Sequence, residues 1–489
     1  MIPSLLETTS SYLQIAEQRG STTSLGSLGN PPPHNMEYKQ QKPAPPRVKP
    51  RIIIHGGAGN ITPASIPPDL YAEYRASLLT IISKTNSYMH TPSPTFPSAL
   101  ETATFAVTLL ENSPLYNSGH GAVFTRDGLN ELEASIMVSR GRAKRAVGVM
   151  GLRHVKNPIL LARAILEHGD ADLGAKTTTT TTTTPTPQKQ QSDLNVPSAQ
   201  GHSQIHGAAA EQLAKKYGLE LVEPEYFYTR KRWDEHIRAL EREKRGEGLG
   251  SWSSDEYLPQ GTCGAIALDA DGVVCCATST GGLTNKLTGR IGDTPTVGAG
   301  FWAEEWTEEG DPSSSSGEDG SPAVELSGPL KGLIADCLPS LFIYAPVPVP
   351  VSGGLLRTTR SVAISGTGNG DSFLRTTAAR TVAAIARFSG VSSAVAVTKV
   401  TGPDGELQRS AGKRWGKTGE GEGGMIGIEC VVVRDSKGNV VETRSEILQD
   451  YNCGGMFRAW VDDDGQAYAR IWREDQQVLG LSIGGVKLG

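Results

Sequence analysis

The residues best suited to nucleophilic chemistry are two threonines, Thr262 and Thr280, which lie eighteen positions apart. Thr262 begins an apolar segment, 262–268, and Thr280 follows a second one, 273–278. Between them, the sequence Asp-Ala-Asp-Gly at 269–272 is typical of a tight turn. The pattern predicts a buried β-hairpin. A hairpin of this length brings both hydroxyls to the same end of a sheet.

A threonine hydroxyl attacks a carbonyl only when a base takes its proton. All nine histidines precede Thr262, the last being His236, and none has metal-ligand spacing. The α-amine of the threonine itself, with an ordinary pKa of about 8, suits general-base catalysis. That amine is free only after cleavage of the Gly261–Thr262 bond, and a glycine there leaves room for the attacking hydroxyl. The alternative is that Thr262 merely begins a strand.

The composition is that of a globular protein with no marked attraction for nucleic acid or membranes. The 489 residues are 37% hydrophobic and carry a net charge of −5. The six cysteines lack metal spacing and favour a reducing compartment. The N-terminus has no basic region followed by an apolar core, and no run approaches the roughly 18 apolar residues that span a membrane. We expect a cytoplasmic protein.

The first half of the chain alternates expected strands and helices with polar segments. We expect the proline-rich residues 1–50 to be a disordered leader, and residues 175–200, with their threonine run, to be a low-complexity insertion. The polar segment 246–260 ends directly before Gly261 and suits backbone cleavage. The other expected elements are a strand at 51–59, a helix at 99–110, a strand pair at 122–125 and 130–137, a helix near 207–213 and a charged surface helix at 233–245.

The second half combines strands with glycine-rich loops and shows no repeat of fixed period. Residues 303–360 include serine-rich, acidic and proline-rich sequence, which indicates a second insertion. The other expected elements are a strand at 361–364, a helix at 372–388, a loop at 401–424 and strands at 425–433, 440–447 and 456–461.

Two glycine-rich segments imitate nucleotide-binding motifs. In residues 366–371 the third glycine comes one residue too early for a dinucleotide fingerprint, and no acidic strand end follows. Residues 411–418 lack the first glycine of a P-loop and run into a Gly/Glu sequence that is unsuited to the required helix. We expect no nucleotide cofactor.

Several ordered motifs together resemble the plant-type L-asparaginase / isoaspartyl peptidase family. These are N-terminal-nucleophile (Ntn) hydrolases, in which a threonine freed by self-cleavage is the nucleophile. The strongest motifs are Gly-Thr-Cys-Gly-Ala-Ile-Ala-Leu-Asp at 261–269, Ala-Thr-Ser-Thr-Gly-Gly at 277–282 and Gly-Arg-Ile-Gly-Asp at 289–293. Further matching segments lie at 55–59, 110–121, 365–371 and 452–459, so that the resemblance covers most of residues 51–489 apart from the insertions.

The resemblance implies an α+β fold, the four-layer αββα sandwich of Ntn hydrolases. It also implies autocatalytic cleavage between Gly261 and Thr262, giving an α chain that includes 51–261 and a β chain of 262–489. We expect the two chains to remain together as an αβ heterodimer; whether such units pair into a dimer is left open by the sequence. The implied substrate is a small molecule, either L-asparagine, cleaved at its side-chain amide, or a β-aspartyl (isoaspartyl) dipeptide.

The resemblance assigns catalytic roles to four residues. Thr262 matches the nucleophile, and Thr280 matches the family's second threonine, which supports it by hydrogen bonding. Thr367 and Gly368 match the pair that stabilises the oxyanion, which is commonly the largest electrostatic contribution to such catalysis.

Further residues match positions that hold the substrate. Arg290 matches the guanidinium that binds the substrate α-carboxylate in a bidentate way. Asp293 matches the acceptor of the substrate ammonium, assisted by the backbones of Gly368 and Gly370. Asn117 matches an asparagine that packs near the nucleophile.

The resemblance implies no required cofactor, but it includes a loop that holds a structural sodium ion through backbone carbonyls. The matching residues are Leu110, Glu111, Ser113, Tyr116, Ser118 and His120.

Some positions depart from the family pattern. Ser118 replaces an alanine, Glu133 an aspartate, and Asn369 and Asp371 a histidine and a glutamate. These residues flank the expected pocket and bear on substrate preference. Two alternatives stay open: a threonine aspartase-like protease from a sister family, and an uncleaved, non-catalytic scaffold of the same fold. Another sister family, glycosylasparaginase, is secreted to lysosomes, and we expect no signal peptide here.

Overall fold

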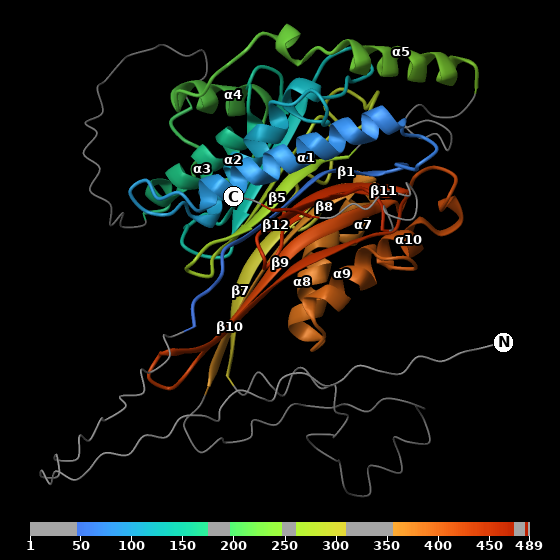
Figure 1. The fold of residues 1–489 in the computed structure, drawn as a ribbon. Helices are drawn as coiled ribbons and strands as arrows, with labels where there is room; N and C mark the ends of the chain where they lie inside the picture. Colours follow the sequence, from blue (N-terminus) through green and yellow to red (C-terminus); the bar gives the residue numbers. More distant parts are fainter. Residues whose placement is uncertain (1–45, 175–195, 247–260, 310–355, 474–484, 488–489) are drawn as a thin grey trace, which may run out of the picture. The chain divides into compact units, whose positions relative to one another are not determined.

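Two β-sheets and the helices packed on them form the structure, a computed structural model that describes residues 46–174, 196–246, 261–309, 356–473 and 485–487. All of these belong to one unit of chain contacts, residues 45–489. Helices and strands mix along the chain, which confirms the α+β class. Figure 1 shows the sheets and their helices.

The larger sheet has nine strands in the order β13-β12-β11-β1-β5-β6-β2-β3-β4. Neighbouring strands are antiparallel except β3 and β4, which are parallel. The strands are β1 (Arg51–Gly59), β2 (Leu132–Val138), β3 (Ala146–Leu152), β4 (Gln204–His206), β5 (Cys263–Leu268), β6 (Val274–Thr280), β11 (Gly455–Val461), β12 (Gln466–Arg470) and β13 (Val486–Lys487).

The smaller sheet has four antiparallel strands in the order β10-β9-β8-β7. They are β7 (Phe301–Glu309), β8 (Arg357–Gly368), β9 (Gly423–Arg434) and β10 (Val440–Tyr451). Its long central strands β8 and β9 pair along their whole lengths.

Helices pack on each sheet. Those in contact with the larger sheet include α1 (Pro68–Met89), α2 (Ala99–Glu111), α3 (Pro158–Asp172) and α4 (Gly207–Lys216). A further helix, α5 (Arg230–Lys244), follows α4 in the chain. The smaller sheet contacts α8 (Ala378–Phe388) and α9 (Ser393–Thr401). Helix α7 (Gly370–Thr376) packs against α8, and α10 (Glu406–Ala411) packs against α7 and α9. Helix α2 begins at a capping box, in which Ser98 and Glu101 satisfy each other's backbone amides.

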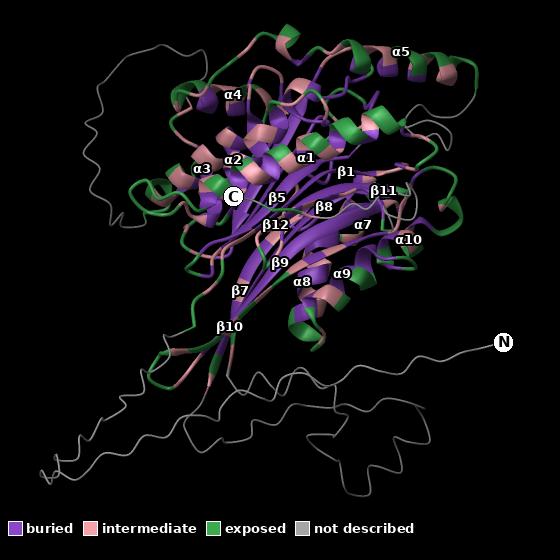
Figure 2. Ribbon diagram, viewed as in Figure 1, coloured by how far each residue is buried: buried purple, intermediate pink, exposed green. Residues whose placement is uncertain are grey.

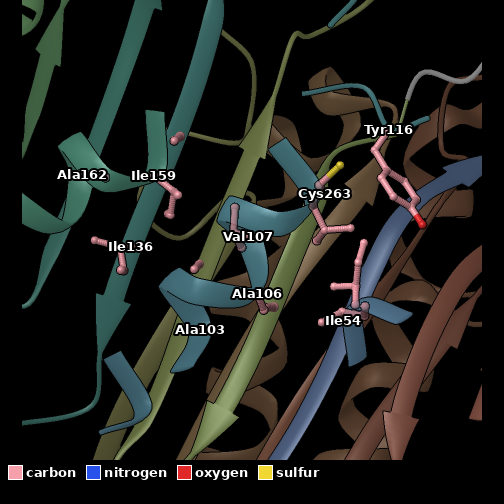
Figure 3. Packing of buried hydrophobic residues seen from close by; sticks show 14 of the residues in the cluster. Ile54, Ala103, Ala106, Val107, Tyr116, Ile136, Ile159, Ala162 and Cys263 are labelled. Carbon is pink, nitrogen blue, oxygen red and sulfur yellow. The ribbon is translucent and has the colours of Figure 1, made fainter. Parts of the chain in front are cut away.

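The alternation of side chains along the strands separates the hydrophobic cores. On β1, Ile52 and Ile54 point into the core beneath α1–α3, whereas Ile53 points into the core between the sheets. On β8, Ala363 faces the inter-sheet core, and Val362 and Ile364 face α8 and α9. Strands β2, β5, β6 and β9 are buried on both faces along almost their whole lengths (Figure 2), and Figure 3 shows the packing around Ile54 and Cys263. Each such isoleucine contributes about 1.5–3 kcal/mol.

Several expected elements are confirmed with small shifts of their ends. These include the helix at 99–110, the hairpin at 262–278, the helix at 207–213 and the three C-terminal strands at 425–461.

Others are wrong. Residues 122–125 are not a strand, because β2 pairs with β3 and β6 rather than with a local neighbour. The helix expected at 372–388 is broken at Thr377, whose φ of 47° is left-handed. The loop expected at 401–424 contains helix α10.

The insertion expected at 303–360 is shorter than predicted, because β7 runs to Glu309 and β8 starts at Arg357. Most of the leader 1–50, most of the threonine-rich insertion 175–200, the segment 247–260 and the interior 310–355 lie outside the described residues. Among the described residues, no helix combines the length and hydropathy that crossing a membrane requires.

Candidate active site

The two candidate threonines lie at the same end of one hairpin. Cys263 on β5 pairs with Ser279 on β6, so that Thr262 and Thr280 are the next residues outward on either strand. Both side chains are buried. The hairpin register therefore brings the two hydroxyls to one sheet end, where the spacing predicted them.

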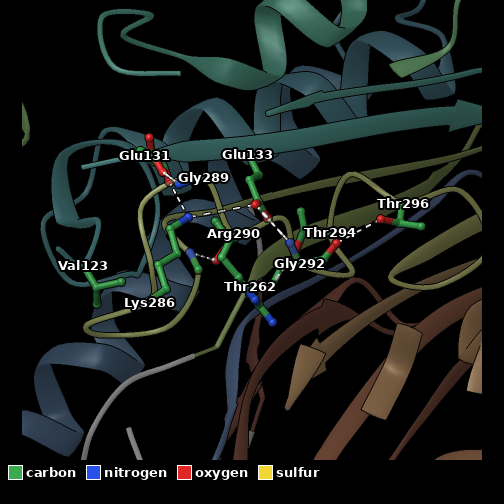
Figure 4. A network of polar contacts seen from close by, with 12 residues as sticks. Val123, Glu131, Glu133, Thr262, Lys286, Gly289, Arg290, Gly292, Thr294 and Thr296 are labelled. Carbon is green, nitrogen blue, oxygen red and sulfur yellow. Dashed lines mark hydrogen bonds and ion pairs between the residues drawn. The ribbon is translucent and has the colours of Figure 1, made fainter. Parts of the chain in front are cut away.

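The hydroxyl of Thr262 has an unexpected hydrogen-bond partner. Thr262 Oγ1 lies 3.0 Å from Thr294 Oγ1 (Figure 4). The hydroxyl of Thr280 instead accepts a hydrogen bond of 3.0 Å from the backbone amide of Gly282. Thr294 was not singled out in the sequence, although it directly follows Asp293, a residue that was.

The peptide bond expected to be cut is tightly enclosed by the end of β1. A side-chain carbon at Gly261 would lie 2.1 Å from Gly57 Cα and 2.5 Å from the nitrogen of Ala58. Glycine is therefore required at 261 by close backbone approach. The amide of Ala58 also donates to Thr367 Oγ1 at 3.2 Å, which brings the expected oxyanion residue to the same glycine turn.

A histidine does lie near Thr262, but it is a poor base. His55 on β1 pairs with Gly264 in the register and is fully buried. Its Nε2 lies 2.6 Å from Ser365 Oγ on β8. Burial lowers the pKa of His55 to about 3, against a smaller opposing effect of the Thr262 backbone. The imidazole is thus neutral near pH 7 and serves to join the two sheets.

The residues expected to hold the substrate converge. A side-chain carbon at Gly370 would lie 2.5 Å from Asp293 Oδ1 and 3.1 Å from Arg290 Nη2. Arg290 Nη2 also forms an ion pair of 3.1 Å with Asp371, whose side chain is exposed. Arg290, Asp293 and Gly370 therefore form one cluster at the start of α7, as predicted.

Asp293 has the features of a site for a cation. It is buried, and its Oδ2 has no hydrogen-bond partner among the described residues. Burial raises the pKa of Asp293 to about 7, and Arg290 opposes that rise. A buried carboxylate oxygen without a donor is costly. A bound ammonium group would satisfy it.

A buried polar network fixes the loop that carries Arg290 (Figure 4). The carboxylate of Glu133 accepts from the amide of Gly292 at 3.1 Å, and Glu131 accepts from the amide of Gly289 at 2.7 Å. Lys286 donates to the Glu131 carbonyl at 2.9 Å and lies 3.9 Å from the Glu133 carboxylate. Burial lowers the pKa of the Lys286 amine. Glu133, noted as a departure from the family, thus holds the backbone of the loop that carries Arg290.

The expected oxyanion pair lies at the end of β8. Thr367 is buried, and Gly368 has a φ of 144°, where a side-chain carbon would lie 2.4 Å from the carbonyl oxygen of Glu422. Asn369 caps α7, because its side chain accepts from the amide of Ser372 at 3.1 Å. Its departure from the family's histidine has this local structural role.

Asn117 supports the turn that follows Thr280. Its side-chain amide donates to the carbonyl of Gly282 at 2.7 Å and accepts from the amide of Val123 at 3.0 Å. The Gly281 amide donates to the Asn117 carbonyl. Both ends of this side chain are therefore used by backbone groups.

The expected sodium loop is a compact turn of backbone carbonyls. A side-chain carbon at Gly119, where φ is 51°, would lie 2.3 Å from the carbonyl oxygen of Glu111, so the loop closes only around a glycine. Arg232 of α5 is buried and donates to the carbonyls of Leu115 and Gly121, at 3.1 and 2.8 Å. Three of the carbonyls expected to hold sodium, those of Leu110, Tyr116 and Ser118, accept hydrogen bonds from backbone amides within the loop. The helix expected at 233–245 is confirmed, but it is not a surface helix on every face, since Glu235, His236 and Ala239 are buried.

Below this loop lies a second buried carboxylate. Glu111 accepts from Ser279 Oγ at 2.7 Å and from the amide of Ile159 at 3.0 Å, and Ser118 Oγ lies 2.6 Å from Ser279 Oγ. Burial raises the pKa of Glu111 to about 7. Ser118, another departure from the family, thus joins the loop to the strand that ends at Thr280.

Comparison with known proteins identifies the family. The family model described as Asparaginase matches residues 48–183 and 194–308. The isoaspartyl peptidase of Escherichia coli K12 is 32% identical over 426 residues, which are 86% of this chain and 96% of that protein. The plant-type L-asparaginase of Pyrococcus furiosus is 33% identical over 261 residues, 52% of this chain and 70% of that protein. The chain therefore belongs to the asparaginase family.

Proposed function

We propose that this protein is an autoprocessing amidohydrolase whose nucleophile is Thr262, acting on the side-chain amide of L-asparagine, on β-aspartyl dipeptides, or on both. One observation carries the proposal. The Thr262 hydroxyl contacts Thr294, and the residue before Thr294 is a buried aspartate with an unpaired carboxylate oxygen. A nucleophile and an ammonium site are thereby held by consecutive residues.

Self-cleavage begins with attack of Thr262 Oγ on the carbonyl carbon of Gly261. The new C–O bond replaces the C–N bond, and the hydroxyl proton passes to the departing nitrogen. Water then hydrolyses the ester, which restores the hydroxyl and leaves Gly261 with a free carboxylate. The products are a chain of 261 residues and a chain of 228 residues that begins with Thr262.

Turnover uses the amine that this cleavage frees. The amine takes the proton of Thr262 Oγ while the oxygen attacks the side-chain carbonyl carbon of the substrate. The amine then returns the proton to the leaving nitrogen, releasing ammonia or an amino acid. Water hydrolyses the acyl-enzyme in the same way and releases aspartate. His55, the histidine near Thr262, has too low a pKa to act as the base, so the freed amine takes this role.

The aspartyl part of the substrate is a zwitterion, and the proposed pocket is complementary to it. The guanidinium of Arg290 would bind the α-carboxylate, and the Asp293 carboxylate would accept from the α-ammonium, with Gly368 and Gly370 beside them. Thr367 and Gly368 would donate to the oxyanion that forms on the attacked carbonyl. The aspartate formed in the reaction carries the same two groups and is expected to inhibit.

We further propose the four-layer αββα sandwich of Ntn hydrolases, with the cut chains held together as an αβ heterodimer and paired as a dimer of such units. A structural sodium ion held by the carbonyls of the 110–120 loop completes the proposal, and no other cofactor is required. Free cysteines at all five described positions support a reducing, cytoplasmic location.

The test is an assay of ammonia or amino-acid release from L-asparagine and from a β-aspartyl dipeptide. We expect Thr262→Ala to remain uncut and inactive, and Thr262→Ser, which keeps a hydroxyl, to retain cleavage and partial activity. Hydrolysis by Thr262→Ala at the wild-type rate would exclude the proposed nucleophile. A wild-type protein that is cut but hydrolyses only a larger aspartyl-containing substrate would favour the threonine aspartase-like alternative.

A further inference from the structure

The hydroxyl of Thr294 is the polar group that touches the proposed nucleophile. The two Oγ1 atoms are 3.0 Å apart, and both side chains are buried, with exposed fractions of 5% for Thr262 and 1% for Thr294. In the described part of the chain this is the hydrogen bond of the Thr262 hydroxyl. The hydroxyl of Thr280, to which the family resemblance assigns that role, instead accepts a hydrogen bond from the Gly282 amide.

Thr294 is itself held in place by the sheet. Its backbone carbonyl accepts a hydrogen bond of 2.6 Å from Ser135 Oγ and lies 3.5 Å from Thr278 Oγ1. Ser135 on β2 and Thr278 on β6 face each other in the register and hydrogen-bond to each other. The position of Thr294 is therefore set by two strands of the sheet that also contains Thr262's own strand.

The turn around Thr294 is closed by its own backbone. The amides of Thr296 and Gly300 both donate to the carbonyl of Asp293, at 3.0 and 3.1 Å. A turn fixed in this way holds the Thr294 hydroxyl at one position relative to Asp293.

We propose that Thr294 is a positioning residue for the nucleophile, and this inference rests on the proposed function. The hydrogen bond between the two hydroxyls fixes the Thr262 rotamer and so holds its oxygen in place for attack on the carbonyl carbon of Gly261. After cleavage the same contact holds the hydroxyl until the amine takes its proton. Thr294 does not touch the substrate. It acts through Thr262.

The position next to Asp293 gives this contact a second consequence. The group that accepts the substrate ammonium and the group that holds the nucleophile are consecutive residues of one rigid turn. The distance between the bound ammonium and the attacking oxygen is therefore fixed by a single peptide unit. Small errors in such a distance are costly, since a displacement of about 1 Å can lower the rate on the order of 100-fold.

The experiment compares Thr294→Val, which removes the hydroxyl at nearly constant volume, with Thr294→Ser, which keeps it. Thr296→Val is the matched control, because it removes a hydroxyl and one hydrogen bond from the same turn without reaching Thr262. The readouts are the rate of appearance of the chain that begins with Thr262, and kcat and KM for L-asparagine on the cut protein.

We expect Thr294→Val to slow self-cleavage at least about tenfold and to lower kcat of the cut fraction with little change in KM. Thr294→Ser should remain within a few-fold of wild type, as should Thr296→Val. Wild-type rates in Thr294→Val would overturn the inference. Equal loss in Thr294→Ser and Thr294→Val would also overturn it, because keeping the hydroxyl would then give no advantage. If Thr294→Val does not fold, Thr294→Ala replaces it as the variant without the hydroxyl, and rates in Thr294→Ala equal to those in Thr294→Ser would overturn the inference. An uncut wild-type protein would instead contradict the proposed function.

Discussion

At the residue scale, the candidate site depends on the short turn 290–296. It carries Arg290 and Asp293, which are complementary to the two charges of an amino acid, and Thr294, which contacts Thr262. Glu133 and Lys286, both buried, pack against it. Buried polar groups of this kind are costly unless fully paired. Among the described residues of this turn, Asp293 has an unpaired carboxylate oxygen, Oδ2, which lies where the substrate's ammonium is proposed to bind.

Asp293 predicts a pH dependence of ligand binding. Its pKa of about 7 means that the carboxylate, which the ammonium requires, is lost as the pH falls below that value. We expect the inhibition constant of L-aspartate to rise as the pH falls from 8 to 6, and Asp293→Asn to bind weakly at every pH. An inhibition constant that is equally pH-dependent in Asp293→Asn would contradict this role.

The raised pKa of Asp293 also predicts how the stability of the fold depends on pH, with a sign opposite to that of ligand binding. Because the folded state raises the pKa of Asp293 from 3.8 to about 7, folding favours the protonated form, and the contribution to stability falls as the pH rises between those values. Asp293→Asn should therefore unfold at a higher temperature than wild type at pH 8, and this difference should shrink toward pH 4. Thermal melts of both proteins at the two pH values test it.

The ion pair between Asp371 and Arg290 predicts that removing the charge of Asp371 tightens the binding of substrate. It forms an ion pair with Arg290, the group proposed to bind the α-carboxylate, and so competes with the substrate. Because Asp371 is exposed, the pair contributes at most about 1 kcal/mol. Asp371→Asn should lower KM for L-asparagine up to about fivefold and leave kcat unchanged. Glu420→Gln, which removes a nearby charge that pairs with Arg375 and Arg414, is the control. A higher KM in Asp371→Asn would mean that Asp371 orients Arg290 instead.

Sequence patterns predicted most of these residues but not all of them. Thr262, Thr280, Arg290, Asp293 and Gly370 belong to motifs, and the structure brings them to one end of the hairpin and its neighbouring turn. Thr294 and His55 were missed for different reasons. Thr294 contacts Thr262 only through the shape of the turn, and His55 arrives through strand pairing with a segment more than two hundred residues away.

At the element scale, the hairpin β5–β6 and the strand β1 position the scissile bond. Only glycine fits at position 261, because Gly57 and Ala58 lie against it, and Thr262 follows directly before β5. The hairpin was predictable from apolar segments around a tight turn. The partners of β2 were not, because β3 and β6 are recruited by long-range pairing and no local turn indicates them.

Two arginines of helix α5, two residues apart, should differ greatly in their contribution to the stability of the fold. Arg232 is buried, pairs with Glu235 and donates to the carbonyls of Leu115 and Gly121, whereas Arg230 forms an exposed pair with Asp234. Arg232→Met should lower the free energy of unfolding by about 3–5 kcal/mol, since Glu235 loses its partner. Arg230→Met should cost less than about 1 kcal/mol. Urea denaturation of the two variants tests this, and equal losses would contradict the assigned contacts.

At the scale of the whole molecule, cleavage would not separate the chains. Strand β1, which precedes the cut, lies between β5 and β11, which follow it, and β2 pairs with β6 across the same boundary. The hydrophobic core beneath α1–α3 also draws residues from both sides of the cut. The general class of the fold was predictable, whereas this interleaving of strands is decided by pairings that no local sequence pattern specifies.

We therefore expect the cut protein to elute as a single particle at neutral pH and to separate into two chains only in denaturant. Size-exclusion chromatography with light scattering measures the mass of the native particle, and denaturing electrophoresis of the same peak shows whether it contains two chains. Separate elution of the two chains without denaturant would contradict the strand order across the cut.

The most direct test of the central claim is the intact mass of the purified protein with sequencing of its N-termini. The account predicts two chains, of 261 and 228 residues, the second beginning Thr-Cys-Gly-Ala-Ile-Ala-Leu-Asp, and a single chain of 489 residues for Thr262→Ala. A wild-type chain that stays whole after long incubation, or that is cut at another bond, would contradict it.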